Sequence, residues 1–230
     1  MATTCPICER RRAKRFCPGL ARSRWAGKTQ NICAQCCGEQ REVTIDCPAD
    51  CPYLVAGHRY EAARPGAGSK GRRRPTAKEL AFPDVVITQD FLEEKQLLLA
   101  GLSLFIVRFA REHPDVRDPE LLAALDALAR GYQTLESGLY YEQPPEGLAA
   151  KALYATLQGY LNQYAQEQQQ RAGVSPRPGE VLRALVFLRR LGQGEANERP
   201  LSRRYLEFLR AQFPSEATAP SESPLIIPGR

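Results

Sequence analysis

Histidine, methionine and tryptophan are scarce in this chain of 230 residues, which contains two, one and one of them, respectively. Two histidines are too few for a typical catalytic zinc site, which combines histidine or carboxylate ligands with a bound water. We expect His58 to face solvent from a helix rather than to replace a metal ligand. His113 directly precedes Pro114, so we expect it at a helix end, where it interacts favourably with the helix dipole.

Catalytic motifs are also missing. The sequence shows no Ser/His/Asp set, no glycine-rich phosphate loop and no pair of carboxylates in a motif typical of acid–base catalysis. We therefore expect that the protein is not an enzyme. A cysteine enzyme or a thiol-redox sensor is an alternative, because either needs only one thiolate that no metal occupies.

Long apolar runs and targeting signals are absent as well. The longest apolar stretch, residues 97–109, is interrupted by Gly101, Ser103 and Arg108, whereas a membrane-spanning helix needs about 18 or more apolar residues in a row. The first residues, Met-Ala-Thr-Thr-Cys-Pro, lack the apolar core of a secretion signal. We expect a cytoplasmic protein that makes no contact with a membrane.

Cysteine is confined to the first 51 residues, where all eight lie, and the remaining 179 residues contain none. A head of about 60 residues with few large aliphatic side chains is too small to form a stable core without cross-links such as bound metal ions or disulfides. Closely spaced cysteines in a cytoplasmic protein bind metal more often than they form disulfides, although disulfides or an iron–sulfur cluster are alternatives. Eight thiolates fill two tetrahedral zinc sites completely. We therefore predict two structural Zn²⁺ ions, with the ligands Cys5, Cys8, Cys17, Cys33, Cys36, Cys37, Cys47 and Cys51.

The cysteine spacing leaves two pairings open. Cys5/Cys8 and Cys33/Cys36 are C-x2-C pairs, each of which presents two thiolates from one tight turn. In a sequential arrangement, one metal binds Cys5, Cys8, Cys17 and Cys33, and the other binds Cys36, Cys37, Cys47 and Cys51. In an interleaved arrangement, one metal binds Cys5, Cys8, Cys33 and Cys36, and the other binds Cys17, Cys37, Cys47 and Cys51. Adjacent Cys36 and Cys37 point in different directions, which favours the interleaved arrangement.

The cysteine string also carries a family resemblance. The run Ile32-Cys33-x3-Cys37-x9-Cys47-x3-Cys51, after the earlier C-x2-C pair, resembles the MYND and HIT families of cross-brace zinc fingers over residues 5–51. That resemblance implies two metals bound in alternation by a small interaction module. The chain departs from those families at Cys17, which lacks a C-x2-C mate, and in having cysteine where they have a histidine near the end. The fuller string is also similar to a family of bacterial cysteine-rich proteins with helical C-terminal regions, which implies no activity.

Positive charge is concentrated in the same part of the chain. Residues 1–78 contain 16 Lys and Arg against 6 Asp and Glu, whereas the remainder contains 16 against 20. Two Zn²⁺ with eight thiolates subtract four charges, so the head stays basic at about +6. Such a surface with an aromatic side chain can bind phosphates and stack on bases, which makes a nucleic-acid-binding accessory factor our first alternative. Its predicted contacts are Arg10, Arg11, Arg12, Lys14, Arg15, Arg22, Arg24, Trp25, Arg72, Arg73 and Arg74. A plainer interpretation is that these side chains keep the head soluble and donate hydrogen bonds to metal-bound sulfur.

A change in composition separates the head from the rest of the chain. We predict a zinc-binding module over residues 1–61, a flexible basic linker over 62–80, a helical bundle over 81–213 and a loose tail over 214–230. Residues 81–87 look extended. Leu225-Ile226-Ile227 is too apolar for a purely solvated tail, and we expect it to dock beside Val85, Val86 and Ile87.

Apolar residues at three- and four-residue spacing predict five helices after the linker. They are expected to begin near Thr88, Asp118, Leu148, Pro178 and Pro200, and Asp90 with Glu93 fits a reciprocal capping pattern for the first. Short connections favour antiparallel neighbours, so we expect a mainly α protein with a small two-zinc head and an up-and-down bundle of about five helices.

These observations predict a zinc-binding, non-enzymatic adaptor or regulatory protein whose partner is another protein. Tyr140 and Tyr141, beside a proline-rich loop, are the best candidates for an exposed recognition patch in the bundle. We also expect the head and the bundle to be independent, so that chelation unfolds only the head.

Overall fold

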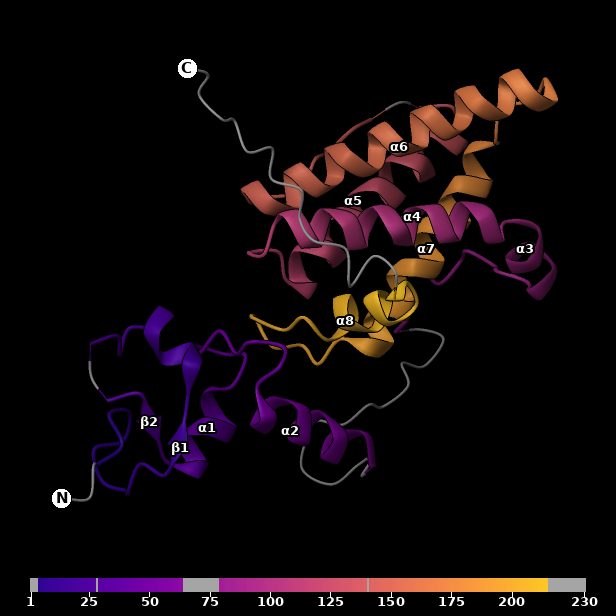
Figure 1. Ribbon diagram of the computed structural model, residues 1–230. Helices are drawn as coiled ribbons and strands as arrows, with labels where there is room; N and C mark the ends of the chain where they lie inside the picture. Colours follow the sequence, from indigo (N-terminus) through magenta and orange to yellow (C-terminus); the bar gives the residue numbers. More distant parts are fainter. Residues whose placement is uncertain (1–3, 28, 64–78, 140, 215–230) are drawn as a thin grey trace, which may run out of the picture.

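The computed structural model describes residues 4–27, 29–63, 79–139 and 141–214, most of which are helical. As predicted, a cysteine-rich head precedes a larger group of helices (Figure 1). Residues 64–78, which make up most of the predicted linker, and Leu225-Ile226-Ile227 of the tail lie outside the described residues. The elements are β1 (Arg15–Phe16), the 3-10 helix η1 (Pro18–Arg22), β2 (Asn31–Ile32), α1 (Ala34–Gln40), α2 (Pro52–Ala63), α3 (Gln89–Glu94), α4 (Gln96–Glu112), α5 (Asp118–Glu136), α6 (Leu148–Ala172), α7 (Pro178–Glu195) and α8 (Arg204–Ala211).

The head contains little regular structure and a small core. Strands β1 and β2 pair antiparallel, with Arg15 opposite Ile32. Leu20, Ile32 and Ile45 are each at most 2% exposed and pack among the cysteines. Together with Leu54 of α2, which is 3% exposed, these are the four large aliphatic side chains buried in the described part of the head. They form a much smaller core than a stable domain of this length needs, which supports the expectation that the cysteines contribute to its folding.

The bundle is built around α5, which packs most extensively on α7 and then on α6, while α4 packs on α6. Figure 1 shows α4, α5 and α6 lying side by side, with α7 crossing them. The centre of the core consists of fully buried leucines from four helices, Leu102, Leu125, Leu157 and Leu185. None of the helices in the described part of the chain combines the length and the hydropathy that crossing a bilayer requires.

The first predicted bundle helix is divided at Lys95 into α3 and α4. Lys95 has φ −102° and ψ 18°, so its backbone leaves the α-helical conformation. Its ammonium group lies 2.8 Å from Glu94 and 3.1 Å from Glu180 of α7. The ion pair with Glu180 holds the break against α7, a tertiary contact that no local pattern reveals.

Thr88 caps α3, because its hydroxyl accepts a hydrogen bond from the amide of Phe91 at 3.2 Å. The predicted reciprocal capping by Asp90 and Glu93 is wrong. Asp90 lies inside the first turn of α3, and Glu93 accepts a hydrogen bond from Gln89 instead.

The segment before α3 bends rather than extending fully. The amide of Val85 donates to the carbonyl of Phe82 at 3.0 Å, and Phe82 has φ +54°. Arg190 of α7 donates to the carbonyls of Ala81, Phe82 and Val85 at 2.9, 2.5 and 2.9 Å. One guanidinium group therefore holds this segment along α7.

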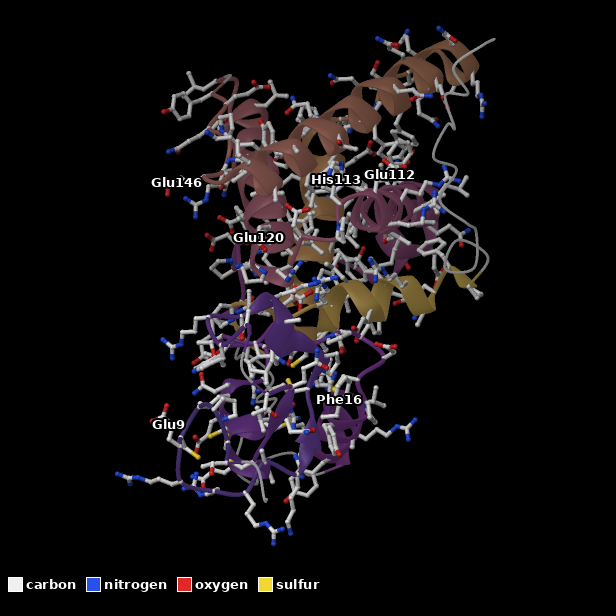
Figure 2. The ribbon with its side chains drawn as sticks, turned by 60° about the vertical axis from the view of Figure 1, so that its left-hand side comes forward. Glu9, Phe16, Glu112, His113, Glu120 and Glu146 are labelled. Carbon is white, nitrogen blue, oxygen red and sulfur yellow. The ribbon has the colours of Figure 1, made fainter. Side chains whose placement is uncertain are left out.

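The head lies against the bundle. Figure 2 shows α8 between the head, where Glu9 and Phe16 are labelled, and the remaining helices, where His113 is labelled. An ion pair of 2.7 Å between Asp46 of the head and Arg203 next to α8 joins the two parts. The structure therefore connects the head to the bundle by side-chain contacts as well as by the chain between them.

Candidate metal centre

Four thiol groups come together in the head. The sulfurs of Cys5, Cys8, Cys33 and Cys36 all lie within 4.8 Å of one another, so that the group can hold a metal ion. The sulfurs of Cys8 and Cys33 are 3.9 Å apart. In a tetrahedral site with Zn–S bonds of about 2.3 Å, the sulfurs are separated by about 3.7 Å. The described arrangement thus needs only a small contraction to enclose an ion.

The members of this group are those of the interleaved arrangement. The sequential arrangement requires Cys17 in place of Cys36, and Cys17 is not part of the group. Within the described residues, which include all eight cysteines, no disulfide is formed.

Two local structures deliver the four thiols. The first C-x2-C pair lies in a tight turn, closed by a hydrogen bond from the amide of Glu9 to the carbonyl of Cys5 at 2.8 Å. The second pair begins α1, where Cys33 is the N-cap residue and its sulfur accepts from the amide of Cys36 at 3.4 Å. An N-cap side chain lies beside the residue three positions later. The C-x2-C spacing at a helix start therefore places both sulfurs on the same side.

Hydrogen bonds favour the thiolate form at two of these positions. Backbone amides of Arg10 and Arg11 lower the pKa of Cys8 to about 6. Burial opposes ionisation of Cys33, but the amide of Cys36 and the guanidinium of Arg11 nevertheless lower its pKa. Burial, followed by hydrogen bonds with Cys33 and Cys8, raises the pKa of Cys36. A metal ion that binds to this mixed set of thiolates and thiols displaces the remaining protons, so that all four groups become thiolate ligands.

The group is closed. Cys5 is fully buried, and Cys33 and Cys36 are each 3% exposed. Four protein ligands complete a tetrahedral coordination sphere and leave no position for water or substrate. The arrangement can therefore stabilise the fold by binding metal, but it offers no metal-bound nucleophile.

The other four cysteines do not form such a group in the described structure. Cys17, Cys37 and Cys51 are buried and Cys47 is half-buried in the same head. Burial and then the charges of Cys37 and Cys51 raise the pKa of Cys17. Burial, which outweighs a hydrogen bond from the amide of Glu42, and the charges of Cys17 and Cys51 raise the pKa of Cys47 to about 12. These thiols are thus close enough to influence one another, although a second metal site is not shown.

The basic side chains of the head have several different surroundings. Arg10, Arg12, Lys14 and Arg22 are exposed, whereas the guanidinium of Arg11 hydrogen-bonds to Cys33, which raises the pKa of Arg11.

Two aromatic rings in the head are each in contact with an arginine side chain. Arg15 lies 4.6 Å from the ring centre of Tyr53, and Arg24 lies 4.4 Å from the ring centre of Trp25. One face of Trp25 is therefore already covered by Arg24. Arg72, Arg73 and Arg74 lie outside the described residues.

The two histidines serve in contacts with protein groups. The Nε2 of His58 is 3.1 Å from a carboxylate oxygen of Glu42, and the His58 side chain is 16% exposed. The prediction that it faces solvent is therefore wrong, because α2 turns this position toward the buried Glu42. His113 ends α4 as predicted, and its ring stacks on that of Phe109 with the centroids 4.1 Å apart.

Comparisons with protein-family models, with curated proteins and with solved structures find no match to this chain. The chemistry of the centre therefore has to be inferred from the residues and geometry described above.

Proposed function

We propose that Cys5, Cys8, Cys33 and Cys36 hold a structural Zn²⁺ ion and that the protein is a non-enzymatic adaptor or regulator that binds another protein. The observation that carries this proposal is the gathering of four sulfurs within 4.8 Å, from three buried cysteines and the half-buried Cys8. Four thiolates at this spacing suit one soft or borderline ion. An iron–sulfur cluster fits less well, because the cluster itself separates its ligand sulfurs.

A second zinc site completes the proposal. Its ligands are Cys17, Cys37, Cys47 and Cys51, which lie in the same small head and influence one another's charge. Cys37 directly follows Cys36, so one turn of α1 supplies a ligand to each site. Coordination of a second ion by these four thiolates would add a second cross-link that stabilises the head, whose apolar core is small.

Zinc counts in cysteine variants test the two sites and their pairing. Native mass spectrometry of the full chain should find two zinc ions, and one in each of the single variants Cys33→Ser and Cys36→Ser. The double variant is decisive. Interleaved ligands predict that Cys33→Ser/Cys36→Ser retains one zinc, whereas sequential ligands predict that it retains none. A chain that binds no zinc, or variants that keep both ions, would refute the proposed sites.

Exposed apolar side chains next to the proline-rich connection between α5 and α6 support a protein partner. Leu139, Tyr141 and Leu148, which lie within ten positions of the sequence, are 69%, 63% and 90% exposed, and large exposed apolar side chains are what a protein partner can cover. Tyr140 lies outside the described residues.

The triple variant Leu139→Ser/Tyr141→Ser/Leu148→Ser should abolish cross-linking to a cellular protein while circular dichroism stays unchanged. Val174→Ser removes an apolar side chain that is 66% exposed beyond the end of α6, and this control should retain the cross-link. Equal cross-linking by both variants would exclude this surface.

A nucleic-acid partner is the second candidate, favoured by the exposed Arg10, Arg12, Lys14 and Arg22 on the head. Fluorescence anisotropy with a single-stranded oligonucleotide should then show binding that weakens steeply with salt. The absence of binding at low salt would remove this candidate.

A further inference from the structure

Residues 41–47, which we call the docking turn, connect the two sets of cysteines. The turn begins directly after α1, which contains Cys36 and Cys37, and it ends at Cys47. The amides of Val43, Thr44 and Ile45 all donate to the carbonyl of Gln40 at 3.1 Å. The conformation of the turn is therefore tied to the end of α1.

The inner side of the docking turn packs against the head. Ile45 is 1% exposed and belongs to the head core. The backbone of Gly19 lies so close that a Cβ atom there would be 2.6 Å from both Ile45 and the carbonyl oxygen of Asp46. This fit leaves the turn little freedom while the head is folded.

The outer side of the docking turn binds the bundle. The carboxylate of Asp46 lies 2.7 Å from Arg117 and 2.7 Å from Arg203. The carbonyl of Arg41 accepts from Arg199 at 2.8 Å, and that of Glu42 accepts from the amide of Leu201 at 2.8 Å. The partners belong to the start of α5 and to the connection between α7 and α8.

Glu42 contacts the docking turn and the bundle at the same time. Its amide donates to the carbonyl of Ile45 at 3.1 Å, while its carboxylate accepts from Asn197 at 2.8 Å and lies 3.1 Å from His58. The residue is 3% exposed and has φ +53°, a conformation that is costly outside glycine. These contacts within the turn and with the bundle must therefore hold it in that conformation.

The contacts continue from the connection into α8. Ser202, fully buried, donates to the carboxylate of Asp118 at 2.7 Å. The same carboxylate accepts from the amides of Tyr205 and Leu206, both at 3.1 Å, and thereby satisfies the first turn of α8. Tyr205, Leu206 and Leu209 are each at most 2% exposed, so release of α8 would uncover apolar surface.

We infer that metal occupancy of the head controls the docking of α8 on the bundle, so that loss of metal loosens α8 and uncovers the apolar side chains beneath it. The inference rests on the proposed zinc sites. Metal binding holds the cysteines at both ends of the docking turn, and the turn presents Glu42 and Asp46 to the connection that positions α8. Without metal, the turn loses both anchors and these contacts loosen.

Hydrogen–deuterium exchange of the full chain tests this coupling, with zinc bound and after removal by a chelator. The readout is exchange at the amides of Tyr205 and Leu206. We expect metal removal to reduce their protection at least about tenfold, because the partly buried ion pairs of Asp46 and the hydrogen bonds around them contribute to the stability of α8. Peptides from the centre of α5 and α6 should keep their protection.

Two aspartate variants make the test specific. Asp46→Asn should lower the protection of α8 with zinc still bound, and chelation should then lower it little further. Asp126→Asn removes a carboxylate that pairs with Arg130 and Arg189 within the bundle, and it should leave the zinc dependence of α8 unchanged.

The possible failures are distinguishable. If zinc binds and the head loses protection on chelation while α8 does not, the coupling is wrong and the metal sites stand. If Asp46→Asn leaves the protection of α8 and its dependence on zinc as in the wild type, the coupling between the metal sites and α8 does not depend on the docking turn. If the chain binds no zinc, both the proposed sites and the coupling are refuted.

Discussion

The guanidinium of Arg203 lies 2.7 Å from the carboxylate of Asp46, although the two residues are 157 positions apart. Arg117 shares that carboxylate from the start of α5, also at 2.7 Å. Burial, followed by the charge of Arg203, lowers the pKa of Arg117. Two arginines thus depend on one carboxylate, which makes Asp46 the electrostatic centre of the contact between the head and the bundle.

Replacement of Asp46 should therefore destabilise the protein. Asp46→Ala leaves Arg117 and Arg203 facing each other without an anion, and we expect a loss of about 2 kcal/mol of unfolding free energy, less than for a fully buried pair. Chemical denaturation measures this value. Asp126→Ala removes a pair with the largely exposed Arg130 and a longer contact of 3.5 Å with Arg189, and it should cost less, about 1 kcal/mol. Equal effects of the two variants would contradict the importance assigned to Asp46.

Two glycine variants test how tightly the docking turn packs on the head. In Gly19→Ala, the new methyl group would lie 2.6 Å from the carbonyl oxygen of Asp46, so we expect a loss of about 1–3 kcal/mol. Gly38, within α1, has no atom within 4 Å of such a methyl group. Gly38→Ala should stabilise the protein by up to about 1 kcal/mol. Thermal unfolding followed by circular dichroism compares the two variants. An unchanged unfolding temperature in Gly19→Ala would show that the docking turn moves to accommodate the methyl group and is not tightly packed.

The segment before α3 should come loose when Arg190 is replaced. Arg190→Met removes the donors to three backbone carbonyls and should cost about 1–3 kcal/mol locally. Limited proteolysis within residues 79–87 should therefore become faster. Arg171→Met replaces an exposed arginine in the last turn of α6 and should leave the cleavage rate unchanged. Unchanged cleavage in Arg190→Met would mean that apolar packing alone holds the segment.

Asp118 should make stability depend on pH. Burial raises its pKa despite hydrogen bonds from Ser202, Tyr205 and Leu206. The folded state therefore binds the proton more tightly than the unfolded state, and this contribution declines as the pH rises from the ordinary aspartate range through the raised pKa. Asp118→Asn lacks it. The difference in unfolding free energy, wild type minus variant, should be largest at low pH and should shrink as the pH rises. A constant difference would contradict the raised pKa.

Each half of the first cysteine site could be anticipated from local spacing, because Cys5/Cys8 and Cys33/Cys36 are each brought together by one turn of chain. Spacing favours the combination of these two halves but leaves the sequential alternative open, because their meeting is a long-range contact. The helical character of the bundle was predictable because apolar periodicity is a local property.

The contacts between head and bundle could not be anticipated in this way. Arg117 and Arg203 are two of 32 lysines and arginines, and no neighbouring residue marks them as partners of Asp46. The break at Lys95 is similar, since it is held by Glu180 from another helix. Likewise His58 has no sequence signal for its contact with Glu42. Long-range pairing of charged side chains decides each of these cases.

X-ray absorption at the zinc edge of the metal-loaded full chain tests the central claim most directly. Four thiolates from Cys5, Cys8, Cys33 and Cys36, with a second set of four, predict that every zinc ion has four sulfur neighbours at about 2.3 Å. Nitrogen or oxygen neighbours at about 2.0 Å would contradict closed four-thiolate sites, as would a purified chain to which no zinc binds.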